Sequence, residues 1–137
     1  MEIPPITALG CKLFGPTALI GGLTALFYYG LIDQAPRKIW VVVPRNKKTI
    51  SSLFRCMRTG TNPKVGIDDH GTFRISNLER TIVEGLRYAS KIGATTAIMA
   101  ARTAIAEGRT TEVKLGKEAT ALGLRSVIHK YWDVITT

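Results

Sequence analysis

Apolar residues in the first part of the chain follow helical spacing and then give way to a strand. Over residues 3–14 they recur at intervals of three and four, which is the period of an amphipathic helix. A second helix is expected from Pro16, which suits a first helical position, to Gly30, which suits a left-handed C-terminal cap. The β-branched and aromatic run Lys38–Val43, closed by Pro44, predicts a strand. Because its side chains do not alternate, this strand is expected to be buried on both faces.

Shorter and weaker strand patterns follow in the middle of the chain. Leu53–Arg58 alternates imperfectly between apolar and basic residues and predicts a second strand. Lys64–Ile67 and Thr72–Ile75 flank Asp68–Gly71, whose residues accept the backbone angles of a tight reversal. We therefore expect a hairpin here, and a small, mostly antiparallel sheet overall.

The last part of the chain has helical patterning throughout. Ser76 and Glu79 stand at the spacing of a capping box, and Gly93 is expected to close the helix that follows. Thr95 is expected to cap the next helix, which ends before Gly108. A third helix spans about residues 112–122 and ends at Gly123, and a fourth begins near Arg125.

These elements predict an α+β fold in one domain over residues 1–137. A small, mostly antiparallel sheet is expected to be flanked by N-terminal helices and by a C-terminal bundle of about four helices. The helices and sheet occupy about residues 1–75, and the helical part occupies about residues 76–135.

Composition agrees with a folded domain. Hydrophobic residues make up 45% of the 137 residues and charged residues 21%, which is a globular balance. The uncharged stretch between Lys12 and Asp33 approaches the length of a membrane span, which needs about 20 apolar residues. Proline, paired glycines and polar residues interrupt it, so a buried helix is favoured, and a membrane-attached protein stays as an alternative.

The two cysteines give the expected compartment. Cys11 and Cys56 have no neighbouring cysteine at metal or redox spacing, so both are interpreted as packing residues. A low cysteine count without a secretory leader fits the reducing cytoplasm, which is the expected location.

Charge is the strongest compositional signal of function. The formal net charge is +9, from 19 Lys and Arg against 10 Asp and Glu, and such an excess favours polyanionic partners such as DNA. Cations concentrate around the predicted strand Lys38–Val43, where they are candidates for sequence-independent phosphate contacts. The alternative interpretation is a solvated loop that only keeps the protein soluble. The candidate residues are Arg37, Lys38, Arg45, Lys47, Lys48, Arg55 and Arg58.

The local sequence lacks the usual signs of catalysis. His70 and His129 have no Cys, Asp or Glu at ligand spacing, and no phosphate-binding or dinucleotide-binding glycine motif occurs. Asp68 and Asp69 are interpreted as turn formers. We therefore expect no catalytic residues, no metal and no cofactor, and a protein that acts by contact and is not an enzyme.

Three blocks of the sequence resemble the AbiEi family, the antitoxins of AbiE-type abortive-infection systems. Residues 19–45 resemble that family's block "sGLsALxxhGLtdqxPxxvyvavPr". Ile75–Glu84, with Lys91–Gly93 and the alanine-rich stretch behind it, is similar to the block "sxxERTivDclryrxkiGldxAleAlrxal". Leu124–Trp132 looks like the closing helix of the family. The blocks stand in the family's order and cover nearly the whole chain.

The resemblance implies an antitoxin and transcriptional regulator that opposes a nucleotidyltransferase-like toxin, without the need for a stable complex between the two. Members of the family usually begin with a winged helix-turn-helix that reads operator DNA, whereas Met1 here falls almost directly before the later domain. The chain is therefore expected either to be a minimal member or to start upstream of Met1. A stand-alone basic module that binds nucleic acid remains the alternative function.

Overall fold

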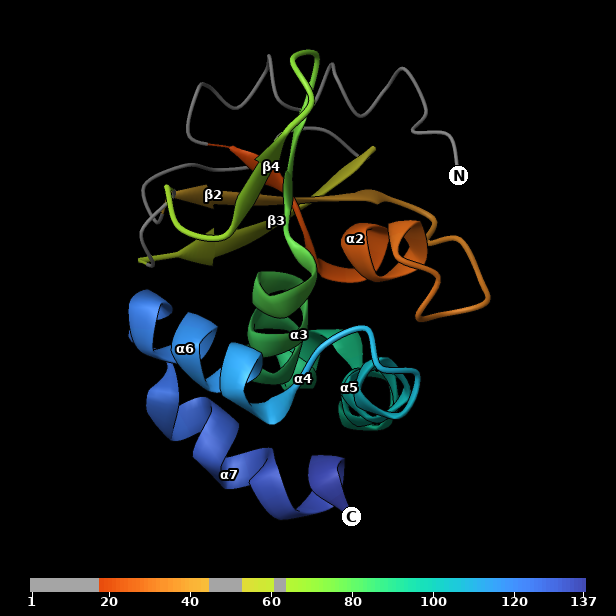
Figure 1. Ribbon diagram of the computed structural model, residues 1–137. Helices are drawn as coiled ribbons and strands as arrows, with labels where there is room; N and C mark the ends of the chain where they lie inside the picture. The colour runs from red at the N-terminus through yellow and green to blue at the C-terminus, as the bar shows by residue number, and fades with distance from the viewer. Residues whose placement is uncertain (1–17, 45–52, 61–63) are drawn as a thin grey trace.

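The computed structural model describes residues 18–44, 53–60 and 64–137 (Figure 1). The helix expected over residues 3–14 lies outside these ranges. The strands are β1 (Leu19–Ile20), β2 (Ile39–Pro44), β3 (Phe54–Thr59), β4 (Ile67–Asp69) and β5 (Arg74–Ser76). The helices are α2 (Gly22–Tyr28), α3 (Leu78–Arg87), α4 (Ala89–Ile92), α5 (Ala94–Ala106), α6 (Glu112–Leu122) and α7 (Arg125–Thr136).

The strands form one mixed sheet in the order β3-β2-β1-β5-β4. β1 is antiparallel to β2 and parallel to β5, β2 is parallel to β3, and β4 is antiparallel to β5. The expectation of a mostly antiparallel sheet is therefore wrong. The reason is β1, a strand of two residues that joins segments far apart in the sequence, with Ile20 paired to both Val41 and Ile75.

The expected start of the second helix is also wrong. Leu19 and Ile20 are strand, and the helix α2 begins at Gly22 and not at Pro16. Gly22 has a φ of +51°, which a glycine adopts at little cost, and this lets the chain turn from strand into helix. The expected end is confirmed, because Gly30 has a φ of +73° and the Leu31 amide donates to the Leu26 carbonyl oxygen. Among the described residues, no helix combines the length and apolarity that crossing a membrane requires.

The expected strand over residues 38–43 is confirmed, and so is its burial on both faces. Trp40 and Val42 pack on the face that also contacts α2, α4 and α5, while Val41 and Val43 belong to the cluster on the opposite face. The expected hairpin also forms, from β4 and β5. Its reversal falls at residues 70–73 and not at 68–71, because Asp68 and Asp69 are strand residues paired with Ile75 and Arg74.

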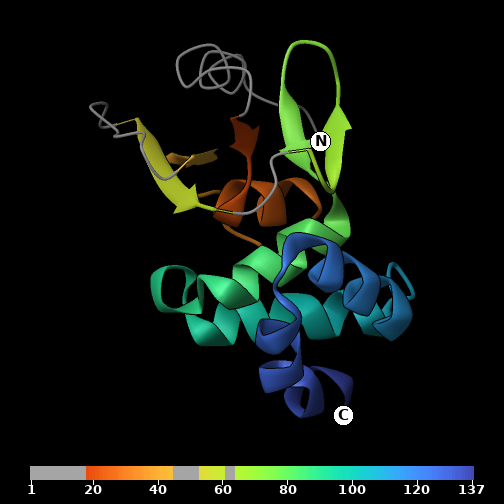
Figure 2. The same ribbon diagram turned by 90° about the vertical axis from the view of Figure 1, so that its left-hand side faces the viewer.

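All the described helices gather on one side of the sheet, and the β4–β5 hairpin rises away from them (Figures 1 and 2). The expected flanking of the sheet by N-terminal helices is thus not observed in the described ranges, where α2 packs on the same side as α3. The helical part has five helices and not about four. Residues 78–92 break into α3 and α4 at Tyr88, whose backbone leaves the helical region and whose ring is buried in the cluster beneath the sheet.

Two expected helix caps are wrong. Asn77, and not Ser76, caps α3, because its side-chain oxygen accepts from the Arg80 amide at 2.8 Å. Ser76 is instead the last residue of β5. α5 begins directly after Gly93, so Thr95 lies inside the helix and does not cap it. The expected left-handed glycine at the end of α6 is confirmed at Gly123, with a φ of +71°.

Candidate functional site

The predicted basic residues lie around β2 and β3, the last two strands at one edge of the sheet. Arg37 and Lys38 precede β2 and are exposed, and Arg55 is exposed on β3. Arg58 belongs to β3, in register with Val43, but its side chain is outside what the structure describes. Arg45, Lys47 and Lys48 lie outside the described residues. The structure therefore places Lys38 and Arg55 at one sheet edge and leaves the rest of the predicted cluster untested.

Arg55 is held over an aromatic ring. The parallel register of β2 and β3 sets Arg55 directly beside Trp40, and the Arg55 guanidinium lies 5.5 Å from the centre of the Trp40 ring. A cation over an indole face is attracted by the quadrupole of the ring. Because Arg55 is exposed, its guanidinium is also accessible to an anion from solution. We call the exposed cations Lys38 and Arg55, together with this ring, the basic edge.

The Trp40 ring and its strand pack closely against the glycine pair at the start of α2. A Cβ atom on Gly22 would lie 2.6 Å from Trp40 Cε3, and one on Gly21 would lie 2.5 Å from Val42 Cγ2. The Trp40 backbone amide donates to Thr24 Oγ1 at 2.8 Å. The glycines therefore permit close packing of the start of α2 against the sheet.

Arg37 faces a different surface from Arg55. It lines a groove of about 560 Å³ between the loop that follows α2 and the start of α5, in company with Asp33. The remaining lining is largely apolar and includes Leu31 and Met99. Because a carboxylate shares this groove, Arg37 adds less to the field of the basic edge than its position in the sequence suggests.

The charged residues of the second sequence block are buried and paired. Arg80 and Glu84, on α3, are 0% and 2% exposed, and Arg80 Nε donates to Glu84 Oε1 at 2.7 Å. Arg80 also donates to the Val65 carbonyl oxygen at 2.6 Å, which ties α3 to the segment before β4. A buried charge that is paired and hydrogen-bonded in this way holds the fold, so we assign these two residues to structure.

Two other titratable groups sit near this pair. Burial, followed by the nearby Glu79 carboxylate, raises the pKa of Glu118 on α6, while Arg80 opposes that rise. Glu118 Oε1 is buried without a hydrogen-bond partner among the described residues. Among the described residues, no group of three or more His, Cys, Asp and Glu side chains is placed to hold a metal ion.

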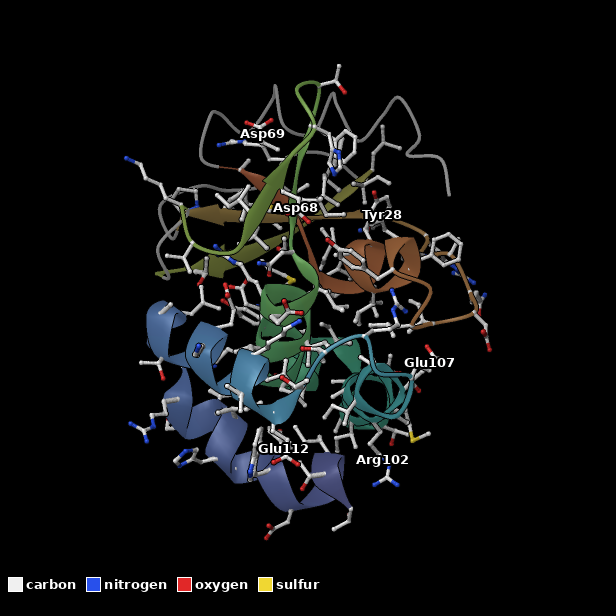
Figure 3. All side chains as sticks on the ribbon, in the orientation of Figure 1. Tyr28, Asp68, Asp69, Arg102, Glu107 and Glu112 are labelled. Carbon is white, nitrogen blue, oxygen red and sulfur yellow. The ribbon has the colours of Figure 1, made fainter. Side chains whose placement is uncertain are left out.

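Tyr29 joins the two main sequence blocks. Its hydroxyl, at the end of α2, donates to the Ser76 carbonyl oxygen at 2.7 Å and lies 3.3 Å from Asp68 Oδ2. Burial, followed by the Asp68 carboxylate, raises the pKa of the Tyr29 hydroxyl. Asp68 and Asp69 both lie on the β4–β5 hairpin, with Asp69 nearer its tip (Figure 3). Asp69 Oδ1 accepts from the Gly71 amide, which agrees with a turn-forming role.

A second basic surface was missed by the sequence reasoning. α6 and α7 pack together and enclose a groove of about 480 Å³. The cations Lys117 and Arg125 line it, together with His129 and beside apolar Val113 and Trp132. These cations lie on two different helices and are not clustered in the sequence. Each does lie three or four residues from an apolar residue of the same groove, and this helical spacing is the pattern that could have predicted the surface.

Neither a comparison with protein-family models nor a search of curated proteins gives a match to this chain. What the described residues offer chemically is therefore judged from their geometry. Cations stand at the surface on the edge of the sheet, and the charged pair that the fold buries is saturated by its own contacts. This arrangement suits the binding of anionic groups from solution.

Proposed function

We propose that the chain is the antitoxin and regulatory component of an AbiE-type toxin–antitoxin system, and that it acts by contact and not by catalysis. The observation that carries the proposal is the way in which the two resembling blocks fold together. Tyr29 from the first block donates to the carbonyl oxygen of Ser76 in the second, and α2 packs on α3. Blocks separated in the sequence thus behave as parts of one structural unit, as a shared family fold requires.

A genetic experiment tests this proposal. The nucleotidyltransferase-like gene expected beside this one is expressed alone and together with the chain, and growth is followed. We expect the toxin gene to arrest growth and the chain to restore it. A matched control expresses the chain with Arg80→Met, which removes the partner of a buried carboxylate and is expected to weaken rescue in step with the amount of folded protein. Growth that stays arrested beside well-expressed, folded chain would reject the antitoxin function.

The second candidate function, a stand-alone module that binds nucleic acid, is favoured by the Arg55–Trp40 contact. Lys38 and Arg55 lie at one end of β2 and β3, and Arg45, Lys47 and Lys48 follow β2 directly in the sequence. β2 runs from Ile39 to Pro44, and a strand advances about 3.3 Å per residue, so this strand measures roughly 16 Å from end to end. That length matches several phosphates of a nucleic-acid backbone.

Binding of a DNA duplex at several salt concentrations tests this second function. We expect affinity to fall steeply with salt, and the double variant Lys38→Gln, Arg55→Gln to lower the slope by about 1 to 2. Arg87→Gln is the matched control, because Arg87 also holds its guanidinium 5.5 Å from a ring centre, that of Tyr88, but on α3. An affinity that is flat across salt, or that Arg87→Gln lowers equally, contradicts a role for the basic edge.

A further inference from the structure

The lining of the groove between α6 and α7 is arranged like a binding site for a third helix. Its lining residues recur at i, i+3, i+4 and i+7 on both helices, so each helix turns one whole stripe toward the groove. The stripes are Val113, Gly116, Lys117 and Thr120 on α6, and Arg125, Ile128, His129 and Trp132 on α7. Helical stripes that face an open trough are the arrangement by which proteins bind amphipathic helices.

The apolar part of this lining is unusually open to solvent. Val113 is 66% exposed, the largest value among the exposed large hydrophobic side chains of the described residues. Trp132 is half-buried at the groove, whereas Ile128 forms its buried floor. An exposed valine beside a tryptophan gains little from a phosphate backbone, but both gain from contact with apolar side chains of a protein.

The charged part of the lining has one sign. Lys117 and Arg125 border the groove, and no carboxylate lines it. Among the described residues, no carboxylate forms an ion pair with Lys117 or Arg125. The rim therefore selects an occupant that carries acidic side chains beside its apolar stripe.

Gly116 adds an independent observation. It lies inside α6, where glycine destabilises a helix relative to alanine, and a Cβ atom there would meet no atom within 4 Å. The fold itself therefore gives no reason for a glycine at this place. A glycine does permit another backbone to approach closely, and Gly116 lies in the stripe that faces the groove.

We propose that the α6–α7 groove binds an acidic amphipathic helix of another protein, with its apolar stripe against Val113, Ile128 and Trp132 and its carboxylates against Lys117 and Arg125. This surface is separate from the basic edge, and the proposal does not depend on the antitoxin function. It assigns a protein partner to the helical half, while nucleic acid is the candidate partner of the sheet edge.

The test uses the full chain and a designed helical peptide as the probe. The peptide has about 18 residues, or five helical turns, with leucine on one face, glutamate on its borders and alanine elsewhere. A second peptide replaces every glutamate with lysine, and a thymidine oligonucleotide is the nucleic-acid probe. Binding is measured by fluorescence anisotropy of the labelled probes and by the emission of Trp132, since the other tryptophan, Trp40, is buried.

We expect the acidic peptide to bind and to shift the Trp132 emission to shorter wavelength, and the basic peptide not to bind. Lys117→Glu with Arg125→Glu should weaken the acidic peptide at least about tenfold, because like charges then meet at the rim. Gly116→Leu should fill the groove and abolish binding, and Gly116→Ala should weaken it, because the added methyl group enters the space of the partner backbone. Gly85→Ala, which lies outside the lining, should keep it. Circular dichroism of each variant reports folding, and the charge reversals act at exposed side chains if Gly116→Leu fails to fold.

Three outcomes overturn the proposal. The first is equal binding of the acidic and basic peptides, or of neither. The second is undiminished binding to folded Gly116→Leu. The third is tighter binding of the oligonucleotide, lost on charge reversal at Lys117 and Arg125, which would assign the groove to nucleic acid.

Discussion

The sheet half and the helical half of this protein differ in where they place charged side chains. In the sheet half, Lys38 and Arg55 stand at an edge, where water reaches them. In the helical half, Arg80 and Glu84 are taken into the interior and satisfied by each other, and further cations border a groove. Among the described residues these two are the buried charged side chains. The position of a cation in the fold therefore decides whether it is available for binding or stabilises the folded state. We expect removal of a buried cation to lower stability much more than removal of an exposed one.

The largest effect is expected at the buried pair. Arg80→Met removes the guanidinium that pairs with the buried Glu84 carboxylate, and we expect the free energy of unfolding to fall by about 3 to 5 kcal/mol. Urea denaturation measures this loss. The double variant Arg80→Met, Glu84→Met removes both charges and should recover much of it. A double variant as unstable as the single one would show that the pair itself is not what makes the position sensitive.

The next effect concerns the glycine that supports the sheet edge. Gly22→Ala places a side chain at a φ of +51°, with its Cβ 2.6 Å from Trp40 Cε3 and 2.7 Å from Met57 Sδ. Backbone strain and overpacking together should cost about 2 to 4 kcal/mol. Thermal unfolding measures the loss, and a stability equal to that of the original chain would contradict the close packing around Trp40.

A smaller effect distinguishes the two candidate caps of α3. Asn77→Ala removes the side chain that accepts from the Arg80 amide and should cost about 1 kcal/mol. Ser76→Ala should be neutral or slightly stabilising, because Ser76 Oγ is buried without a partner among the described residues. Parallel denaturant titrations compare the variants. A larger loss at Ser76 than at Asn77 would restore the capping box expected from the sequence.

Gly116, unlike Gly22, has open space where a side chain would start, and Gly116→Ala tests this difference. Its added methyl group meets nothing within 4 Å, so the better helix propensity of alanine should stabilise the chain by about 0.5 to 1 kcal/mol. The same denaturant titration detects this gain. A loss of stability would mean that α6 needs the glycine for its own packing, and would remove one support for a docked helix.

The smallest effect is a dependence on pH. The folded state raises the pKa of Glu118 above its usual value of 4.5, so ionisation of Glu118 costs stability as pH rises from there through the raised pKa. Glu118→Gln should therefore be more stable than the original chain near pH 7, and the difference should vanish below about pH 4.5. Thermal midpoints across pH measure it, and a difference that does not change with pH contradicts this origin.

The sequence was a good guide where local chemistry decides structure. Burial of β2 on both faces follows from its unbroken β-branched run, and the ends of α2 and α6 follow from Gly30 and Gly123, which adopt the left-handed conformation. The wrong cap at Ser76 is instructive, because Ser76 fits the motif equally well but is used as the last residue of β5. The capping motif predicted the helix α3 correctly. It did not show that Ser76 belongs to the preceding strand β5 and that Asn77 caps the helix.

Tertiary structure decided what depends on contacts between distant segments. Two residues of β1 carry too little pattern to be recognised, yet their pairing to both β2 and β5 makes the sheet mixed. The α6–α7 groove could not be predicted for the same reason, since its cations come close only when the two helices pack together. The sequence by itself determined most of the longer elements, the excess of positive charge and its concentration near β2. The fold decided which charges are buried and which face solvent, because burial depends on neighbours that a linear pattern does not specify.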